Sequence, residues 1–100
     1  MADSFEHARM TGKVAVITGA AQGIGEATAR LFAARGVAGL LLTDRNAERL
    51  ASVAESIAAT GTAVETVVAE LSDITQVETI VPRADARFGR VDVLANIAGL

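Results

Sequence analysis

Hydrophobic and polar positions along this chain alternate between two periods. Short runs of consecutive apolar, largely β-branched residues are typical of strands buried on both faces, and apolar residues three and four positions apart are typical of helices buried on one face. Apolar runs predict four strands, over residues 14–17, 39–43, 63–69 and 91–98. Helical spacing between them predicts three helices, from residue 25 to Gly36, from Asn46 to Gly61 and from Asp73 to Gly89.

Four strands that alternate with three helices have the order βαβαβαβ. Short connections of this kind give parallel strands, right-handed crossovers and helices on both faces of the sheet. We therefore expect an α/β fold, a Rossmann-type doubly wound parallel sheet with strand order 3-2-1-4. The order reverses between the first and fourth strands, and ligands bind at such a point, outside the carboxyl ends of the strands. Residues 1–10 are predicted as a flexible tail and residues 11–100 as one partial domain.

Three residues refine the helix predictions. Asn46 and Asp73 precede helical stretches, and their side chains can accept hydrogen bonds from the first backbone N–H groups. Pro82 falls inside the third predicted helix and removes one backbone hydrogen bond, so we expect a kink or an early break there.

Composition narrows the class of protein. The 100 residues suffice for one small core, and 51% hydrophobic residues with a net charge of −3 are ordinary for a soluble domain. Mild acidity disfavours a nucleic-acid partner. No apolar run approaches the ~20 residues of a membrane span, and the first ten residues lack the apolar stretch of a signal peptide. The lack of cysteine excludes disulfides and thiolate metal sites and fits a cytoplasmic location.

The first strand runs directly into the sequence Thr18-Gly19-Ala20-Ala21-Gln22-Gly23-Ile24-Gly25. Gly19 permits a tight turn, Gly23 lets a pyrophosphate approach the backbone, and Gly25 lets the helix approach the strand. The N-terminus of the helix adds unpaired N–H groups and a partial positive charge, which suit a diphosphate. The turn is therefore predicted to bind a dinucleotide; the alternative is a tight turn without a ligand.

Asp44 stands at the carboxyl end of the second predicted strand, 19 residues beyond Gly25. A carboxylate there can accept hydrogen bonds from both hydroxyls of an adenosine ribose, and it would repel a 2′-phosphate, which favours NAD over NADP. Arg45 argues the other way, because it could reach a phosphate by turning inward. The alternative for Asp44 is a role in the turn or as a helix cap.

Gly-x-x-x-Gly-x-Gly preceded by threonine resembles the short-chain dehydrogenase/reductase family, as does the whole first strand from Lys13 to Ala20. The resemblance extends from Gly12 to the end of the chain. It implies the partial NAD-binding domain of an oxidoreductase. Members that prefer NADP often carry Arg or Lys at the position of Gln22, so the resemblance also favours NAD.

The resemblance implies further cofactor contacts after the third and fourth strands. Glu70-Leu71 stands where the family has an Asp-hydrophobic pair that holds the adenine, and Glu70 is one methylene longer than that Asp. Asn96-Ile97-Ala98-Gly99 resembles Asn-Asn-Ala-Gly, with Ile97 in the second place. Asn96 would line the ribose side or, alternatively, be an ordinary turn residue. The full expected set is Thr18, Gly19, Gln22, Gly23, Ile24, Gly25, Asp44, Glu70, Leu71, Asn96, Ala98 and Gly99.

The residues that carry out the family's chemistry are not expected in this chain. The family uses Ser, Tyr and Lys for hydride transfer, with Tyr-x-x-x-Lys on a helix, and this sequence has no tyrosine. Those positions would lie beyond Leu100, and the only histidine, His7, is in the charged tail. We expect no catalytic residue and no metal site here. The complete protein would interconvert a small alcohol and a ketone, as a homo-oligomer in the manner usual for the family.

Two alternatives stay open at this point: a stand-alone, non-catalytic nucleotide-binding or regulatory module, and an inactive gene fragment. The chain stops directly after the fourth predicted strand, which favours a partial dehydrogenase. Val91, Val93 and Leu94 would then lie at an exposed sheet edge. Such an edge predicts that the isolated chain is marginally stable or self-associates.

Overall fold

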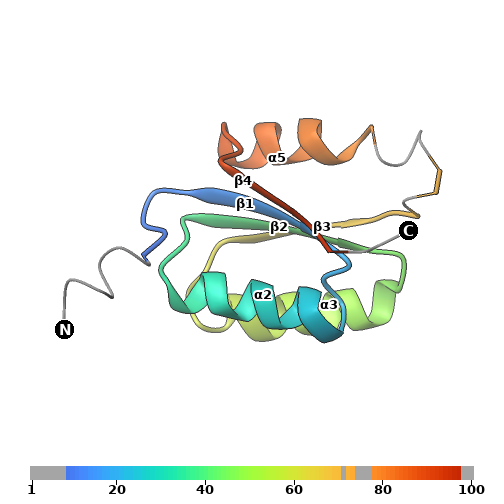
Figure 1. Ribbon diagram of the computed structural model, residues 1–100, viewed down its shortest axis with the longest axis horizontal. Coiled ribbons are helices and arrows are strands. Elements are labelled where there is room, and N and C mark those ends of the chain that lie inside the picture. The colour runs from blue at the N-terminus through green and yellow to red at the C-terminus, as the bar shows by residue number, and fades with distance from the viewer. Residues whose placement is uncertain (1–8, 71, 74–77, 98–100) are drawn as a thin grey trace.

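The computed structural model describes residues 9–70, 72–73 and 78–97, which form one sheet with helices on both faces (Figure 1). The strands are β1 (Val14–Thr18), β2 (Gly39–Asp44), β3 (Val64–Val68) and β4 (Val93–Asn96). The helices are α2 (Gly23–Ala34), α3 (Ala47–Ala58) and α5 (Ile80–Phe88). No helix in these described ranges is long and apolar enough to cross a membrane.

The strands are parallel and lie in the order β3-β2-β1-β4, which confirms the predicted 3-2-1-4 arrangement. β1 is central because it pairs with both β2 and β4. In that register Thr18 lies opposite both Thr43 and Asn96. The carboxyl ends of three strands therefore meet at one edge of the molecule, at the point where the strand order reverses.

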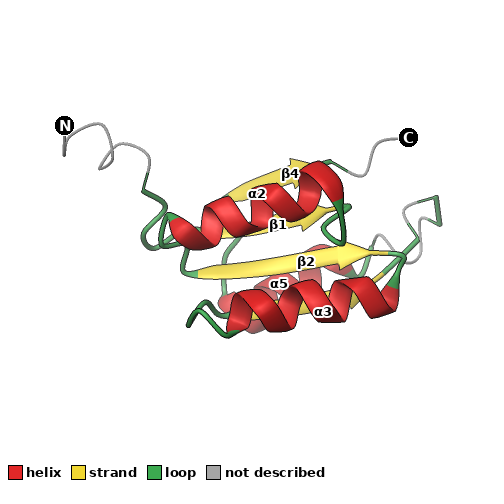
Figure 2. Ribbon diagram, turned by 90° about the horizontal axis from the view of Figure 1, so that it is seen from below, coloured by secondary structure: helices red, strands yellow, loops and turns green. Residues whose placement is uncertain are grey.

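Helices α2 and α3 cover one face of the sheet and α5 covers the other (Figures 1 and 2). Side chains alternate along a strand, so each strand contributes to both layers. Ala15, Ile17, Leu40 and Leu42 pack in the core under α2 and α3, whereas Val16 and Leu41 pack with Ile80 and Ala84 of α5. Every residue of β1 is buried, as its continuous apolar run predicts.

The starts of α3 and α5 differ: α3 has a side-chain cap, and the N-cap residue of α5 makes no such bond. Asn46 caps α3 as predicted, since its side chain accepts a hydrogen bond from the Arg49 N–H at 3.1 Å. The prediction that Asp73 caps the following helix is wrong for α5, whose N-cap is Thr79. The first intrahelical bond of α5 runs from the Arg83 N–H to the Thr79 carbonyl at 3.1 Å.

Pro82 does not interrupt α5, because this helix begins only two residues earlier, at Ile80; whether the chain breaks before it stays a prediction. Pro82 thus lies in the first turn, where a backbone N–H has no intrahelical acceptor in any case. Ile80 and Ala84 of α5 are buried, whereas Val81 between them is 54% exposed. Residues 74–77 lie outside the described ranges.

Strand β4 is shorter than predicted, four residues instead of eight. Among the described residues its only strand neighbour is β1. Leu94 on β4 is 62% exposed and the preceding Val91 is 37% exposed, so this edge of the sheet presents apolar side chains. Self-association through the edge stays a prediction.

Candidate functional site

The turn after β1 lies directly against the first turn of α2. A Cβ atom added at Gly25 would lie 2.6 Å from the carbonyl carbon of Gly19, closer still to its oxygen, and 3.1 Å from the Cα of Ala20. Only a glycine fits between these backbone atoms, which confirms the close approach predicted for Gly25. Gly23 differs, because its φ of +58° favours glycine while the space beside it is open.

The N-terminus of α2 is left uncapped by side chains. Its N-cap, Gln22, has an extended backbone and makes no side-chain cap hydrogen bond. The first bond within the helix runs from the Glu26 N–H to the Gln22 carbonyl at 3.3 Å. The N–H groups of Gly23, Ile24 and Gly25 precede it and have no intrahelical acceptor. With Gln22, Gly23 and Ile24 exposed, these donors and the helix dipole can serve an anion from solvent.

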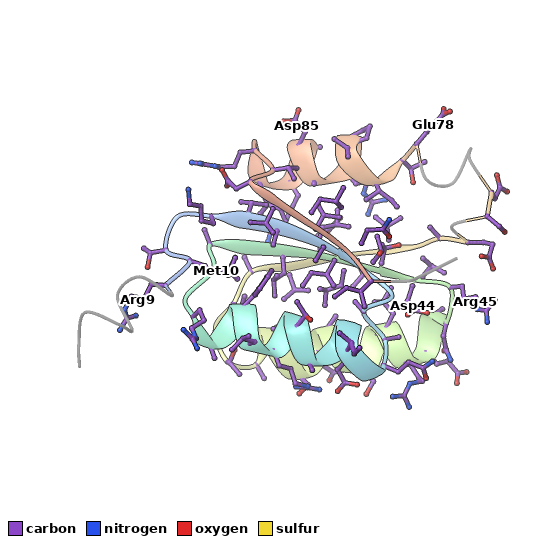
Figure 3. All side chains as sticks on the ribbon, viewed as in Figure 1. Arg9, Met10, Asp44, Arg45, Glu78 and Asp85 are labelled. Carbon is purple, nitrogen blue, oxygen red and sulfur yellow. The ribbon has the colours of Figure 1, made fainter. Side chains whose placement is uncertain are left out.

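Asp44 joins this turn to the end of β2. Its Oδ2 accepts a hydrogen bond from the Ala21 N–H and its Oδ1 accepts one from the Asn46 N–H, both at 3.0 Å. The turn role considered from the sequence is therefore present. A carboxylate has about four acceptor positions, and these two bonds leave others for a ligand. Figure 3 shows Asp44 at this end of the sheet, with Arg45 beside it.

Arg45 and Glu70 face each other across the ends of β2 and β3. The Arg45 guanidinium is 3.6 Å from Oε2 of Glu70, and the two side chains are 78% and 43% exposed. Glu70 Oε1 also accepts a weak hydrogen bond from the Ser72 N–H at 3.4 Å. Arg45, which could have favoured a 2′-phosphate, is thus paired with a carboxylate. Two acidic groups, Asp44 and Glu70, lie at this part of the edge.

A threonine hydroxyl connects the ends of β1 and β4. Thr18 Oγ1 donates to Oδ1 of Asn96 and accepts from the Ile97 N–H, both at 2.9 Å. The amide oxygen of Asn96 accepts this bond, and its NH₂ group can donate to another partner. Ile97 contributes its backbone here, and its side chain packs against the core.

The structure brings the described members of the predicted set to one edge of the sheet, at the ends of β1, β2, β3 and β4. Leu71, Ala98 and Gly99 lie outside the described residues. The structure adds one residue that the sequence did not indicate: Arg49 in the first turn of α3, whose Nε donates to the Ala21 carbonyl at 3.1 Å. No sequence signal marks it, because the contact depends on how α3 lies against the turn. Within the described ranges no three His, Asp or Glu side chains gather as a metal site.

Comparison with known proteins gives a consistent result. Residues 13–100 match the family model described as short chain dehydrogenase. The chain is 43% identical over 89 residues to the 2,3-dihydro-2,3-dihydroxybenzoate dehydrogenase of Bacillus subtilis (strain 168), an alignment that covers 89% of this chain and 34% of that protein.

Solved structures agree with this match. A short chain dehydrogenase/reductase from Burkholderia phymatum in complex with NAD is 37% identical, with a TM-score of 0.82 over 86% of this chain and 30% of that one. L-sorbose reductase from Gluconobacter frateurii, complexed with NADPH and L-sorbose, is 36% identical, with a TM-score of 0.86 over 92% of this chain and 35% of that one. The chain spans about a third of the length of these relatives.

Proposed function

The chain belongs to the short-chain dehydrogenase family, and on this premise we propose that it forms the dinucleotide-binding part of an NAD-dependent oxidoreductase. The complete protein would interconvert an alcohol and a ketone by hydride transfer. The observation that carries the proposal is the bond between Ala21 and Asp44, which holds a carboxylate beside a glycine turn and an uncapped helix N-terminus. A diphosphate and the adenosine ribose attached to it need these two features side by side.

The diphosphate would lie over Gln22, Gly23 and Ile24. Gly23 leaves open space where a side chain would stand, so ligand oxygens can approach the backbone N–H groups. Negative charge at this position is favoured by the partial positive charge of the α2 N-terminus. Thr18 and Gly19 shape the turn beneath it.

The ribose would lie at Asp44, whose remaining acceptor positions suit its two hydroxyls. A 2′-phosphate at the same place would be repelled by about 4 kcal/mol per unit charge at 4 Å and an effective dielectric constant of about 20. The ion pair between Arg45 and Glu70 reduces the electrostatic attraction of that arginine for a phosphate. The neighbours include structures with NAD and with NADPH, so the family alone does not select the cofactor. Asp44 therefore supports NAD.

The remaining expected contacts complete the proposed site. Glu70 and Leu71 would hold the adenine, Asn96 would line the ribose side of the cofactor, and the cofactor would pass close to Ala98 and Gly99. Bound NAD supplies the hydride acceptor, while the residues of this chain bind and orient it. The family match favours this function over a stand-alone regulatory module, because the chain corresponds to one part of longer enzymes. A cytoplasmic location fits the absence of cysteine.

The test is calorimetric titration of the 100-residue chain with NAD and with NADP. We expect NAD to bind at least about tenfold more tightly, which is about 1.4 kcal/mol. Asp44→Asn should bring the two affinities within about threefold of each other, because it removes the repulsive charge. Asp85→Asn is the matched control: Asp85 is exposed on α5, on the opposite side of the sheet from α2 and α3 (Figure 3). Tighter binding of NADP, or no binding by a folded chain, would overturn the proposal.

A further inference from the structure

Ala21, in the glycine turn, is held from both sides of its backbone. It is 1% exposed, and side chains from two different elements bind its backbone. Its N–H donates to Asp44 at the end of β2, and its carbonyl accepts from Nε of Arg49 in the first turn of α3. The neighbouring Ala20 N–H donates to the Thr43 carbonyl at 3.1 Å. Three consecutive backbone groups of the turn, the Ala20 N–H, the Ala21 N–H and the Ala21 carbonyl, are thus bound to the segment from the end of β2 to the start of α3.

Resting on the proposed function, we infer that Arg49 is a positioning residue for the diphosphate-binding turn. A peptide group is planar and trans, so its carbonyl and its N–H point in opposite directions. By holding the Ala21 carbonyl, Arg49 therefore directs the Gln22 N–H away from α3. This N–H precedes the unpaired donors of α2, and its direction determines which donors a diphosphate meets together.

The arginine is itself held in place. Its guanidinium is 3.7 Å from Oε1 of Glu26 in α2, and the other oxygen of Glu26 accepts from Nε of Arg30 at 3.0 Å. Arg30 in turn donates to Oγ of Ser56 in α3 at 3.0 Å. The contacts form a closed path from α3 through the turn and α2 back to α3. Arginine suits this place because its planar group reaches the carbonyl and the carboxylate at the same time.

Arg49 and Asp44 hold opposite sides of one residue, which links the two halves of the proposed site. Because the Ala21 N–H holds Asp44 and Arg49 holds the Ala21 carbonyl, a ribose and a diphosphate meet a turn that is already in place. Arg49 binds the turn from the carbonyl side of Ala21 and pairs with Glu26 in α2, whereas Asp44 binds the N–H side. Loss of the Arg49 side chain should therefore weaken the binding of ligands that contain a diphosphate and leave the binding of ligands without one unchanged.

The experiment compares wild type, Arg49→Gln and Arg35→Gln by calorimetric titration with NAD, ADP and adenosine. Arg35→Gln removes the same charge from the far end of α2, about 18 Å from the turn at 1.5 Å per residue. For Arg49→Gln we expect about tenfold weaker binding of NAD and ADP, the effect of losing one hydrogen bond from a charged donor. The affinity for adenosine should change by less than about twofold. Arg35→Gln should change none of the three by more than about twofold.

Amide hydrogen exchange without ligand separates positioning from simple charge attraction. Arg49→Gln should speed exchange of the Ala20 and Ala21 amides at least about fivefold and leave Val16 in β1 unchanged, because local opening precedes exchange at these bonds. Arg49→Lys should restore part of the protection, and it also serves if the glutamine variant does not fold. Equal weakening of adenosine and ADP, or unchanged exchange at Ala21, would overturn the inference. If the wild type binds neither NAD nor ADP, the proposed function fails, and the exchange comparison still tests Arg49.

Discussion

The contact between Gly25 and the Gly19 carbonyl gives the sharpest stability prediction. In Gly25→Ala the new Cβ would lie 2.6 Å from the Gly19 carbonyl carbon and closer to its oxygen. Both are backbone atoms in a buried turn, so no flexible side chain can move aside. To restore ordinary contact distances, the start of α2 must move away from β1, and Ala20 and Ala21 would lose part of their packing.

The size of the effect follows from two opposing contributions. In an unobstructed helix, replacing Gly by Ala stabilises by about 1 kcal/mol. Overpacking of a rigid site costs about 1–3 kcal/mol and occasionally more. Because the contact at Gly25 is with backbone on two sides, we expect a cost of about 3–4 kcal/mol here. We expect a net loss of about 2–3 kcal/mol from a total of about 5–15 kcal/mol for a domain of this size. The melting temperature should fall by about 10–20 °C.

Gly23→Ala is the control within the same turn. A Cβ at Gly23 meets no atom within 4 Å, and the cost is limited to the left-handed backbone, about 1–2 kcal/mol. Urea unfolding followed by circular dichroism should therefore rank Gly25→Ala below Gly23→Ala in stability. NAD titration should show the complementary defect, at least about tenfold weaker binding by Gly23→Ala, since its methyl group stands where the diphosphate approaches. Equal stability of the two variants would refute the close contact at Gly25.

Two further predictions concern Thr43 and Asp92. The Thr43 hydroxyl is buried with no hydrogen-bond partner among the described residues, so Thr43→Val should raise the free energy of unfolding by about 1 kcal/mol. Thr66→Val on the half-buried β3 is the control. A lower melting temperature for Thr43→Val than for wild type would contradict the prediction. The pKa of Asp92 lies below its ordinary value because Arg90 donates two hydrogen bonds to it and the Val14 N–H a third. The stability from these bonds is fully present above the unfolded-chain pKa of about 3.9 and is lost as pH falls through the lower folded pKa. The melting temperature of Asp92→Asn should therefore fall less than that of wild type below about pH 4, and parallel pH profiles would contradict that reason.

The sheet could be predicted because each strand carries its own signal. Continuous apolar runs such as that of β1 and β2 indicate strands buried on both faces, and alternation with helices then determines the parallel order. The start of α5 could not be predicted from capping residues alone, since Asp73 and Thr79 are both acceptable caps. Pro82 was the better signal: a proline is tolerated in the first turn of a helix, and its position fits a start at Ile80.

The site was predictable where a single residue type is required and not where contacts depend on packing. Gly25 could be inferred from spacing, because only a glycine permits the helix to lie against the turn. Arg49 could not be inferred, since the sequence does not show which group an exposed arginine in the first turn of a helix will contact. Its bond to Ala21 exists because α3 and the turn approach each other across the end of β2.

The two roles considered for Asp44 from the sequence, turn residue and ribose acceptor, are compatible in this structure. The carboxylate uses one position on each oxygen for the Ala21 and Asn46 N–H groups, and about two further positions remain, which is what a ribose diol requires. These backbone bonds fix the side chain before a ligand arrives. Ordering a free side chain on binding costs about 0.5–1.5 kcal/mol, so a carboxylate already held by its own turn binds the ribose more tightly than the same group left mobile.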